Sequence, residues 1–581
     1  MSKPNKSLLR SDEPLNAAAA SYLHGLTQFE EEQQELLEQA RAGLPSLGYA
    51  IPMAAYILEQ HANDAVDHVA PWGFADFSAT FRILAETLVE LTRGTPEADI
   101  PLFIGSVLDQ DPMVERYLRL QLGRILALNE RVSVRGGMRT VTLEGDRYRS
   151  AIADSRRRSA LTLLRTKALY LQHSEEERHI LDRKIVSDVE DDISSLARLT
   201  LTLDMREIDV LRKGLPDTWR RLLSELALEE SSLLSFLAFT SLLPALGFRW
   251  LRGDELFKLM ERFTNEFERD HVSRFEFDRL VELFASDAVT ARRIGSVVPF
   301  LKVGTWFRSW PFVYHALLPE LVFVSLVQSK RPEVWSATFG SDLAGAADYI
   351  AAQLPKFDKV TVVARRKKAG VGDIDLGIYD HVSGDLLICE IKTVFDRFRT
   401  EFQASNFTDQ RVNFRKAVEQ LNAARGALLT GNWSLKDVIG KGAPTIPTTV
   451  HRMVLLWRDH INPSLDDGDF VPACDFATFR FLFERCEGKP ALIAESVEQL
   501  EKIFWVSSDR IDFWPVGDQQ LPYARELETD ALPPMSFLDS LPLNNIVREE
   551  VRTLRRFPSD WEEQLAEAED YRRNYFISRL A

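Results

Sequence analysis

Four charged residues in the second half of the chain have the types and spacing of a catalytic group. Asp373 and Asp375 lie two residues apart, and Glu390 and Lys392 form a Glu-x-Lys motif. Fourteen residues separate Asp375 from Glu390. Carboxylates gathered in one place repel one another unless a cation neutralises them. Oxygen-only ligands favour Mg²⁺ or Mn²⁺. Such an ion beside an ammonium group suits metal-assisted phosphodiester cleavage.

Strand alternation is expected to bring these charges together. Residues 373–379 and 385–392 read as two strands joined by residues 381–384. On the first strand Asp373 and Asp375 should share one face, with Ile374 and Leu376 on the other. On the second strand Glu390 and Lys392 should share a face, while Cys389 and Ile391 point into apolar packing. Charge in an otherwise apolar strand needs a reason; a nuclease-type site is one, and a salt bridge with Asp375 is the structural alternative.

The surrounding pattern predicts the elements that would hold this hairpin. A helix is expected at 341–354, strands at 359–364, 373–379 and 385–392, a helix at 408–424 with Thr408 as its N-cap, and a strand at 451–457. The order α-β-β-β-α-β is typical of a mixed α/β core.

The set Asp375 … Glu390-Ile391-Lys392 in that element order resembles the active-site signature of the PD-(D/E)xK, or restriction-endonuclease-like, nuclease superfamily. Its form is similar to the Holliday-junction-resolvase and RecB-type branch, over residues 332–460 only. The resemblance implies that Asp375 and Glu390 bind the metal, that Ile391 lends a backbone carbonyl, and that Lys392 is catalytic. The family's proline is missing, since Ile374 precedes Asp375, and the family's additional ligand on the first helix stays unassigned.

The helix expected at 408–424 offers one further catalytic candidate. Asn413, Lys416 and Gln420 are spaced to form one polar stripe. RecB-type proteins often carry Gln-x-x-x-Tyr on this helix, whereas Ala424 follows Gln420 here. Gln420 is therefore a candidate helper of the catalytic residues.

Two basic segments are candidates for phosphate contacts. Arg365, Arg366, Lys367 and Lys368 are expected in the turn before Gly372, where they could bind a nucleic-acid backbone or form a solvated loop. A second group of arginines follows a β-hairpin expected at 131–143, and a solvated face with local ion pairs is the favoured interpretation there.

Composition indicates a soluble globular protein of several domains. The chain has 581 residues, of which 45% are hydrophobic and 27% are charged. Its net charge of −16 argues against a protein that coats nucleic acid non-specifically. Residues 331–430, however, hold 14 Lys/Arg against 13 Asp/Glu, so the predicted catalytic segment is nearly neutral and the negative charge lies in the rest of the chain.

The predicted fold class is α+β and multidomain, with a large, mostly α-helical N-terminal region before the restriction-endonuclease-like core. Its expected parts are a disordered lead at 1–15, a helical domain at 16–200, a second at 201–331, the nuclease domain at 332–510, and a linker with a C-terminal helix at 511–581. The uncharged stretch 231–248 is interpreted as a core helix rather than a membrane span.

The sequence lacks the motifs of several other kinds of functional site. The three cysteines form no Cys-x-x-Cys pair and, with no apolar signal segment, predict a cytoplasmic protein. His61, Asp64 and His68 fit an ordinary polar helix face better than a zinc site. Gly440-Lys441 is followed by Gly442, so the sequence has no phosphate-binding loop of a motor.

The sequence thus predicts a Mg²⁺- or Mn²⁺-dependent endonuclease acting on DNA. Expected partners are DNA, further copies of the chain, and a separate sensor or motor protein. The layout is similar to that of anti-phage defence effectors, which is an analogy only. The alternatives are a nucleic-acid-binding or scaffold protein with an inactive nuclease fold, and a helical interaction or membrane-associated protein.

Overall fold

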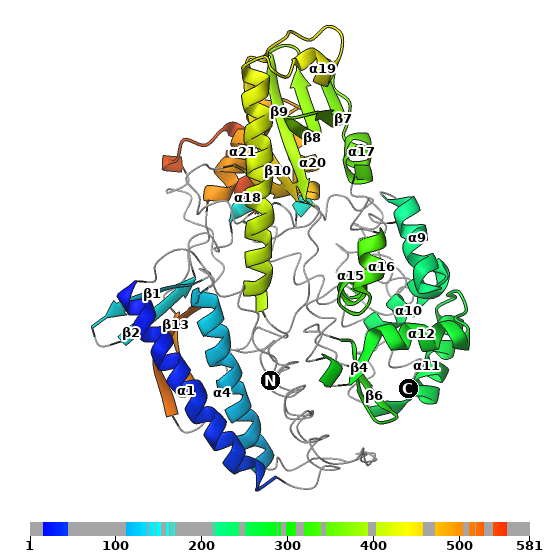
Figure 1. Ribbon diagram of the computed structural model, residues 1–581, viewed down its shortest axis with the longest axis vertical. Helices are drawn as coiled ribbons and strands as arrows, with labels where there is room; N and C mark the ends of the chain where they lie inside the picture. Colours follow the sequence, from blue (N-terminus) through cyan, green and yellow to red (C-terminus); the bar gives the residue numbers. More distant parts are fainter. Residues whose placement is uncertain are drawn as a thin grey trace, which may run out of the picture.

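The computed structural model shows a mixed α/β protein, and the residues that it describes form three separate sheets. Figure 1 shows the arrangement of these sheets and of the helices around them. The structure describes residues 16–44, 112–135, 139–145, 147–152, 159–161, 164, 167–168, 212, 215–242, 250–287, 289–291, 298–309, 319–338, 344–392, 402–456, 471–503, 510–516, 519–527 and 539–554.

A five-stranded sheet of order β11-β10-β9-β8-β7 carries the predicted catalytic segment. β7, β8 and β9 are antiparallel neighbours, whereas β9, β10 and β11 run parallel. The expected order of helix, three strands, helix and strand is found, with a short helix added before β10. The elements are α17 (Ala344–Gln353), β7 (Val360–Lys368), β8 (Gly372–Asp380), β9 (Asp385–Lys392), α18 (Phe402–Leu429), α19 (Leu435–Ile439), β10 (Thr449–Leu456) and β11 (Ala473–Asp475). Because α18 begins at Phe402, Thr408 lies inside the helix, and its prediction as the N-cap was wrong.

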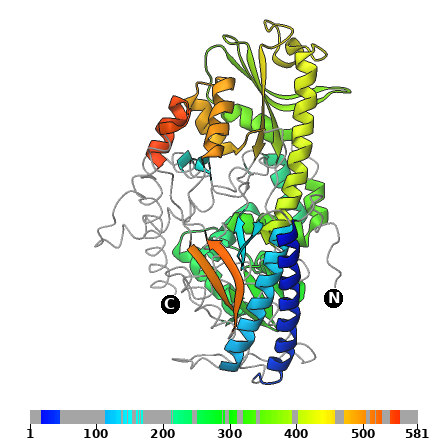
Figure 2. The same cartoon turned by 90° about the vertical axis from the view of Figure 1, so that its left-hand side faces the viewer.

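Helices cover both faces of this sheet. α18 lies on one face, and α20 (Phe476–Arg485) and α21 (Pro490–Lys502) lie on the other, as the two perpendicular views show (Figures 1 and 2). Side chains at Leu386 and Ile388 pack in the cluster under α18, whereas Leu387 and Cys389 pack in the cluster that includes α20 and α21. Burial on both faces explains why β9 reads as an unbroken apolar run before its Glu-x-Lys.

The turn between β8 and β9 sets the register of the hairpin. Asp380 accepts hydrogen bonds from the backbone N–H of Val382 (2.8 Å) and the hydroxyl of Ser383 (3.0 Å). Gly384 has a φ of 76°, and a Cβ there would approach the Thr448 hydroxyl to 2.3 Å, so only glycine fits. This turn places Leu376 opposite Cys389 and thereby brings the start of β8 to the end of β9.

A helical region precedes the sheet in the chain and shares a core with it. One continuous buried cluster contains Trp219 and Phe323 on one side of the predicted boundary at 331 and Cys389 and Leu482 on the other. The region's elements are α9 (Pro216–Leu226), α10 (Glu230–Leu242), β3 (Trp250–Arg252), α11 (Gly253–Glu266), α12 (Arg274–Phe284), β4 (Ala285–Asp287), β5 (Phe300–Val303), β6 (Trp306–Ser309), α15 (Pro319–Lys330) and α16 (Pro332–Thr338).

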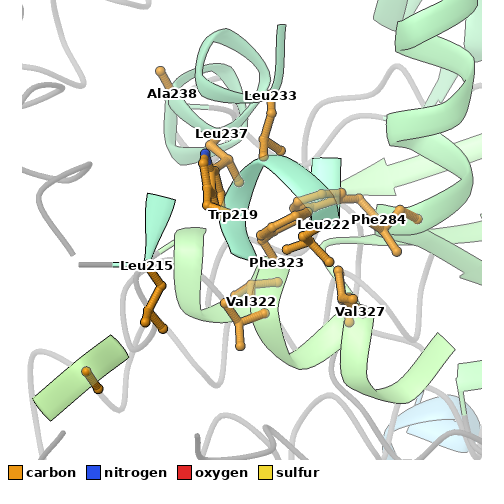
Figure 3. Close-up of a cluster of buried hydrophobic side chains, with 14 of the residues drawn as sticks. Leu215, Trp219, Leu222, Leu233, Leu237, Ala238, Phe284, Val322, Phe323 and Val327 are labelled. Atoms are coloured by element: carbon orange, nitrogen blue, oxygen red, sulfur yellow. The ribbon is translucent and has the colours of Figure 1, made fainter. Parts of the chain in front are cut away.

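The described part of the uncharged stretch, residues 231–242, lies in α10, which is a core helix as predicted, and residues 243–248 lie outside the described residues. Leu233, Phe236 and Leu237 on this helix are fully buried. Neighbouring aromatic rings complete the packing: the Trp219 and Phe323 rings meet edge to face with centroids 6.1 Å apart, as the close-up shows (Figure 3). Across the part of the chain that the structure describes, no helix combines the length and apolar character that crossing a membrane requires.

A third unit joins distant parts of the chain. Helices α1 (Ala17–Arg41) and α4 (Pro112–Arg135) pack side by side against a sheet of order β1-β2-β13-β12. Its strands are β1 (Arg139–Glu144), β2 (Arg147–Ile152), β12 (Arg510–Val516) and β13 (Gln519–Leu527).

This unit corrects two predictions. The hairpin expected at 131–143 lies at 139–152 instead, because α4 continues to Arg135 and buries Val134 against α1. Residues 511–541, expected as part of a linker, include two strands, of which β13 pairs with β2 in parallel. The last described helix, α23 (Asn545–Leu554), packs on α21 and is joined to Lys167 through Glu550 (2.6 Å). The lead 1–15 lies outside the described residues, as does the end of the 511–581 segment from residue 555 on, where a C-terminal helix was expected at 560–580.

The aromatic core of the helical region predicts a large stability cost for truncation. Trp219→Ala should lower the free energy of unfolding by about 3–5 kcal/mol, because the indole is fully buried and its removal leaves a cavity. Phe275→Ala is the matched control, since Phe275 is 63% exposed, and its cost should stay within about 1 kcal/mol. Thermal and denaturant unfolding monitored by circular dichroism measures both, and similar midpoints for the two variants would contradict this packing.

Candidate functional site

The candidate site forms where β8 separates from β9. The two strands pair from Tyr379 to Leu376, and the pairing ends there. At the next position the carboxylate of Asp375 takes the place of a strand carbonyl, because its Oδ2 accepts a hydrogen bond from the backbone N–H of Ile391 (2.8 Å). Asp375 is thus fixed to the strand that carries Glu390 and Lys392, as the sequence predicted.

The strict alternation expected on β8 is wrong at this point. Ile374 packs in the cluster under α18, whereas Leu376 packs in the cluster on the opposite side of the sheet. The neighbouring strand is irregular at the same level, since Arg365 has a φ of 53° between the paired positions Ala364 and Arg366. This local irregularity places the Ile374 and Leu376 side chains on opposite faces of the sheet.

Glu390, Lys392 and Gln420 form a connected group on β9 and α18. The Lys392 ammonium donates to Oε1 of Glu390 (2.7 Å) and to the side-chain oxygen Oε1 of Gln420 (3.2 Å). The Glu390 side chain is 6% exposed and the Lys392 side chain 21%, so the carboxylate is enclosed while the ammonium reaches solvent. The contact with Gln420 brings the predicted helper residue to the site.

The amide of Gln420 also reaches Asp373. Its Nε2 donates to Oδ1 of Asp373 at 3.4 Å, which is a long hydrogen bond. The sequence predicted Asp373 and Asp375 on one face of the strand, and only the family resemblance favoured Asp375 over Asp373 as the metal ligand. Its link to α18 could not be found from the strand pattern, because it depends on where one turn of a distant helix packs.

The site has an excess of buried negative charge. Burial and the neighbouring Asp375 raise the pKa of Glu390 to about 7, although Lys392 opposes this shift. Burial also raises the pKa of Asp375, against the opposing effects of the Ile391 N–H and of Lys392. One ammonium therefore does not fully neutralise the two carboxylates.

The donor atoms fit a hard divalent cation. Oε2 of Glu390 is buried and accepts no hydrogen bond from an N–H or hydroxyl group of the described residues, and Asp375 can share a hydrogen bond with Glu390 only while one of the two carboxyls is protonated. Such an orphaned carboxylate oxygen is costly unless a cation or water satisfies it. Asp375 and Glu390 would hold the ion together with the carbonyl of Ile391. Within the described ranges, no group of three or more His, Cys, Asp and Glu residues that could hold a metal is found.

The four basic residues 365–368 lie in strand β7, so their prediction as a turn was wrong. The reason is pairing with β8, which extends the strand: Lys367 lies opposite Asp373. Arg365 donates to Asp348 (3.0 Å), Arg366 to the carbonyl of Val438 (2.7 Å) and Lys368 to the carbonyl of Asn432.

Lys367 differs from these three neighbours in its contacts. Its side chain is exposed and has no partner in the described part of the chain. It is therefore the member of the group best placed to contact a phosphate.

The other sequence candidates are paired or outside the described residues. Arg131 forms an ion pair with Glu30 (3.0 Å), and the buried Arg139 forms one with Glu130 (3.3 Å), in agreement with local ion pairing rather than phosphate binding. His61, Asp64 and His68 lie outside the described residues. The three cysteines are buried and form no disulfide bond.

Comparison with known proteins gives no relative: no known family, no curated protein and no solved structure matches the chain.

The raised pKa of Glu390 predicts a pH-dependent stability. Between the ordinary carboxyl pKa and about 7, the folded protein keeps a proton on Glu390 that the unfolded chain has lost. The free energy of unfolding should therefore fall as pH rises from 4.5 to 7, by no more than about 3 kcal/mol. Glu390→Gln keeps an acceptor for Lys392 and removes this ionisation. Thermal unfolding from pH 5 to 8 should show a steeper decline for the wild type, and parallel profiles would contradict the assignment.

Proposed function

We propose that the protein is a divalent-metal-dependent nuclease that hydrolyses phosphodiester bonds of DNA. The observation that carries the proposal is the buried Glu390 carboxylate, which has Lys392 on one oxygen and no N–H or hydroxyl donor of the described residues on the other. A purely structural ion pair would not require the second carboxylate of Asp375 beside it. The combination supports a site made to receive a cation and an anionic substrate.

Each residue has a distinct task in this proposal. Asp375 and Glu390 supply negative oxygens for the cation, and the N–H of Ile391 holds Asp375 in position. When bound, Mg²⁺ or Mn²⁺ would polarise the scissile phosphate and lower the pKa of a water molecule. The Lys392 side chain reaches solvent next to the enclosed Glu390 carboxylate.

The two hydrogen bonds that Lys392 makes determine where the third proton of its ammonium group points. An ammonium has three N–H donors, and Glu390 and Gln420 occupy two of them. The third can donate to a non-bridging phosphate oxygen or to the attacking water. The contact with the phosphate would stabilise the negative charge that grows as water bonds to phosphorus and the bond to the leaving sugar oxygen breaks. The contact with water would instead hold its oxygen in position for attack, and the proton that the water loses would pass to the leaving oxygen through solvent.

The position of α18 supports an extended substrate. The helix continues beyond the end of the sheet at which the site lies, and it contacts α4 of the third unit (Figures 1 and 2). Its polar stripe continues from Gln420 to the exposed Lys416 and the half-buried Asn413. A nucleic acid lying along this stripe would meet both the site and the helix that projects past it.

The direct test is nicking of supercoiled plasmid with Mg²⁺ or Mn²⁺, extended to linear duplex, single-stranded and branched DNA and to RNA. Asp375→Ala and Lys392→Ala should each lower the cleavage rate by at least about 10²-fold, because each removes a group that stabilises the transition state. The matched controls are Asp358→Ala and Lys441→Ala, which alter exposed residues of the same charge and should retain wild-type activity. A wild type with no metal-dependent cleavage, or a Lys392→Ala variant as active as Lys441→Ala, would refute the proposal.

Binding measurements should separate the basic residues of β7. Lys367→Ala should reduce the salt dependence of DNA binding by about one phosphate contact, because its ammonium is exposed beside the site. Arg366→Ala should instead lower the thermal midpoint, since this side chain is bonded to the carbonyl of Val438. Fluorescence anisotropy with labelled duplex over a range of NaCl concentrations, with metal withheld, gives the slope. An unchanged slope for Lys367→Ala would exclude it from the interface.

A further inference from the structure

We propose that Asp373 is a positioning residue for Lys392 and acts through the side-chain amide of Gln420. The inference depends on the proposed nuclease function and names the residue that orients its ammonium. The three side chains come from different elements, β8, α18 and β9, and are joined in the order Asp373, Gln420, Lys392.

The two partners of the Gln420 side chain determine the orientation of its amide group. Gln420 presents its oxygen to a donor, the Lys392 ammonium, and its nitrogen to an acceptor, the Asp373 carboxylate. The reversed amide would place two donors together at Lys392 and two acceptors together at Asp373. Asp373 therefore selects the one orientation of Gln420 in which an acceptor faces Lys392.

The position of Asp373 is set by the backbone around it. Gly372 has a φ of 142°, a conformation that favours glycine, and it begins β8 opposite Lys368. Asp373 then lies opposite the exposed Lys367. The adjoining strand thus supports the carboxylate, while Gln420 is held by the turns of α18 that bury Ala417 and Leu421.

The orientation matters because the direction of the third Lys392 proton depends on its two acceptors. Glu390 alone would leave the ammonium free to rotate about a single hydrogen bond. With Gln420 as the second acceptor, two of the three N–H directions are fixed and the third is determined. Without Asp373 the Gln420 amide could rotate and the Lys392 ammonium could adopt several orientations. A smaller fraction of bound substrate would then meet the ammonium in the orientation that cleavage requires.

A different role for Asp373 is that of a third metal ligand, and the two roles predict different kinetics. A ligand sets the affinity for the cation, so its loss would raise the Mg²⁺ concentration that gives half-maximal activity. A positioning residue sets the rate at saturating metal. It should also act only through Gln420, so that removing both residues costs no more than removing Gln420 alone.

The test compares Asp373→Ala, Asp373→Asn, Gln420→Ala and the double variant Asp373→Ala/Gln420→Ala in the full chain, with Asp358→Ala as the control. Single-turnover plasmid cleavage is measured across Mg²⁺ concentrations. Asp373→Ala should slow cleavage roughly 10- to 100-fold with an unchanged Mg²⁺ midpoint. Asp373→Asn keeps an oxygen acceptor for the amide and should recover most of the rate. The double variant should match Gln420→Ala.

Two kinetic outcomes would overturn the inference. One is a raised Mg²⁺ midpoint with an unchanged saturated rate in Asp373→Ala, which would make Asp373 a ligand. The other is a double variant whose cleavage rate is reduced by the product of the two single reductions, which would mean that Asp373 and Gln420 act independently.

A measurement on the metal-free protein keeps the inference separate from the proposed activity. The side-chain amide resonance of Gln420 is identified by its absence in Gln420→Met. Its protons should exchange with water faster in Asp373→Ala than in the wild type or in Asp373→Asn, because the carboxylate no longer binds them. Unchanged exchange would refute the contact itself. Failure of plasmid cleavage by the wild type, with this exchange result intact, would refute the nuclease function and with it the catalytic role, but not the contact.

Discussion

The burial of the Glu390 carboxylate at the end of an apolar strand is the constraint on which the site depends. Leu386–Cys389 are packed on both faces of β9, so the strand enters the interior before its charged residues appear. Removing a carboxylate from water is unfavourable unless opposite charge and hydrogen-bond donors replace the lost solvation. Lys392 supplies both to Oε1, and the raised pKa of Glu390 reflects what remains uncompensated.

The neighbouring elements follow from this constraint. The β8–β9 turn, held by Asp380 and requiring Gly384, sets the register that brings Asp375 to the amide of Ile391. The cluster under α18 holds that helix against β9 and so places Gln420 beside Lys392. The cluster on the opposite face joins the sheet to α20, α21 and the helical region, which makes the site part of a single large core rather than of a detachable module.

The sequence predicted this part of the fold because its signals are local. The apolar run that ends in Glu390-Ile391-Lys392 gave the bounds of β9, 385–392, and alternation brought Asp375, Glu390 and Lys392 together. Alternation assumes a regular strand, however, and failed where β8 leaves β9 at Asp375. The contact between Asp373 and Gln420 could not be predicted, because Gln420 lies on a helix that is distant in the sequence.

Pairing between distant segments explains the other differences. Arg365–Lys368 have weak strand propensity, yet β8 pairs with them and extends β7. Residues 510–527 contain prolines and acidic residues that suggest a loop, but β13 is aligned by β2 from the other end of the chain. Val132 and Val134 suggested a strand, whereas burial of Val134 against α1 keeps α4 helical.

The most direct test of the central claim is the location of a bound cation. Crystals of the full chain soaked in Mn²⁺ and measured by anomalous diffraction would show where the ion binds. We predict one anomalous peak within coordination distance of the Asp375 and Glu390 carboxylates and the Ile391 carbonyl, with Lys392 beside it. A Mn²⁺-saturated crystal with no peak at these atoms, or with Oε2 of Glu390 bonded to a protein donor instead, would contradict it.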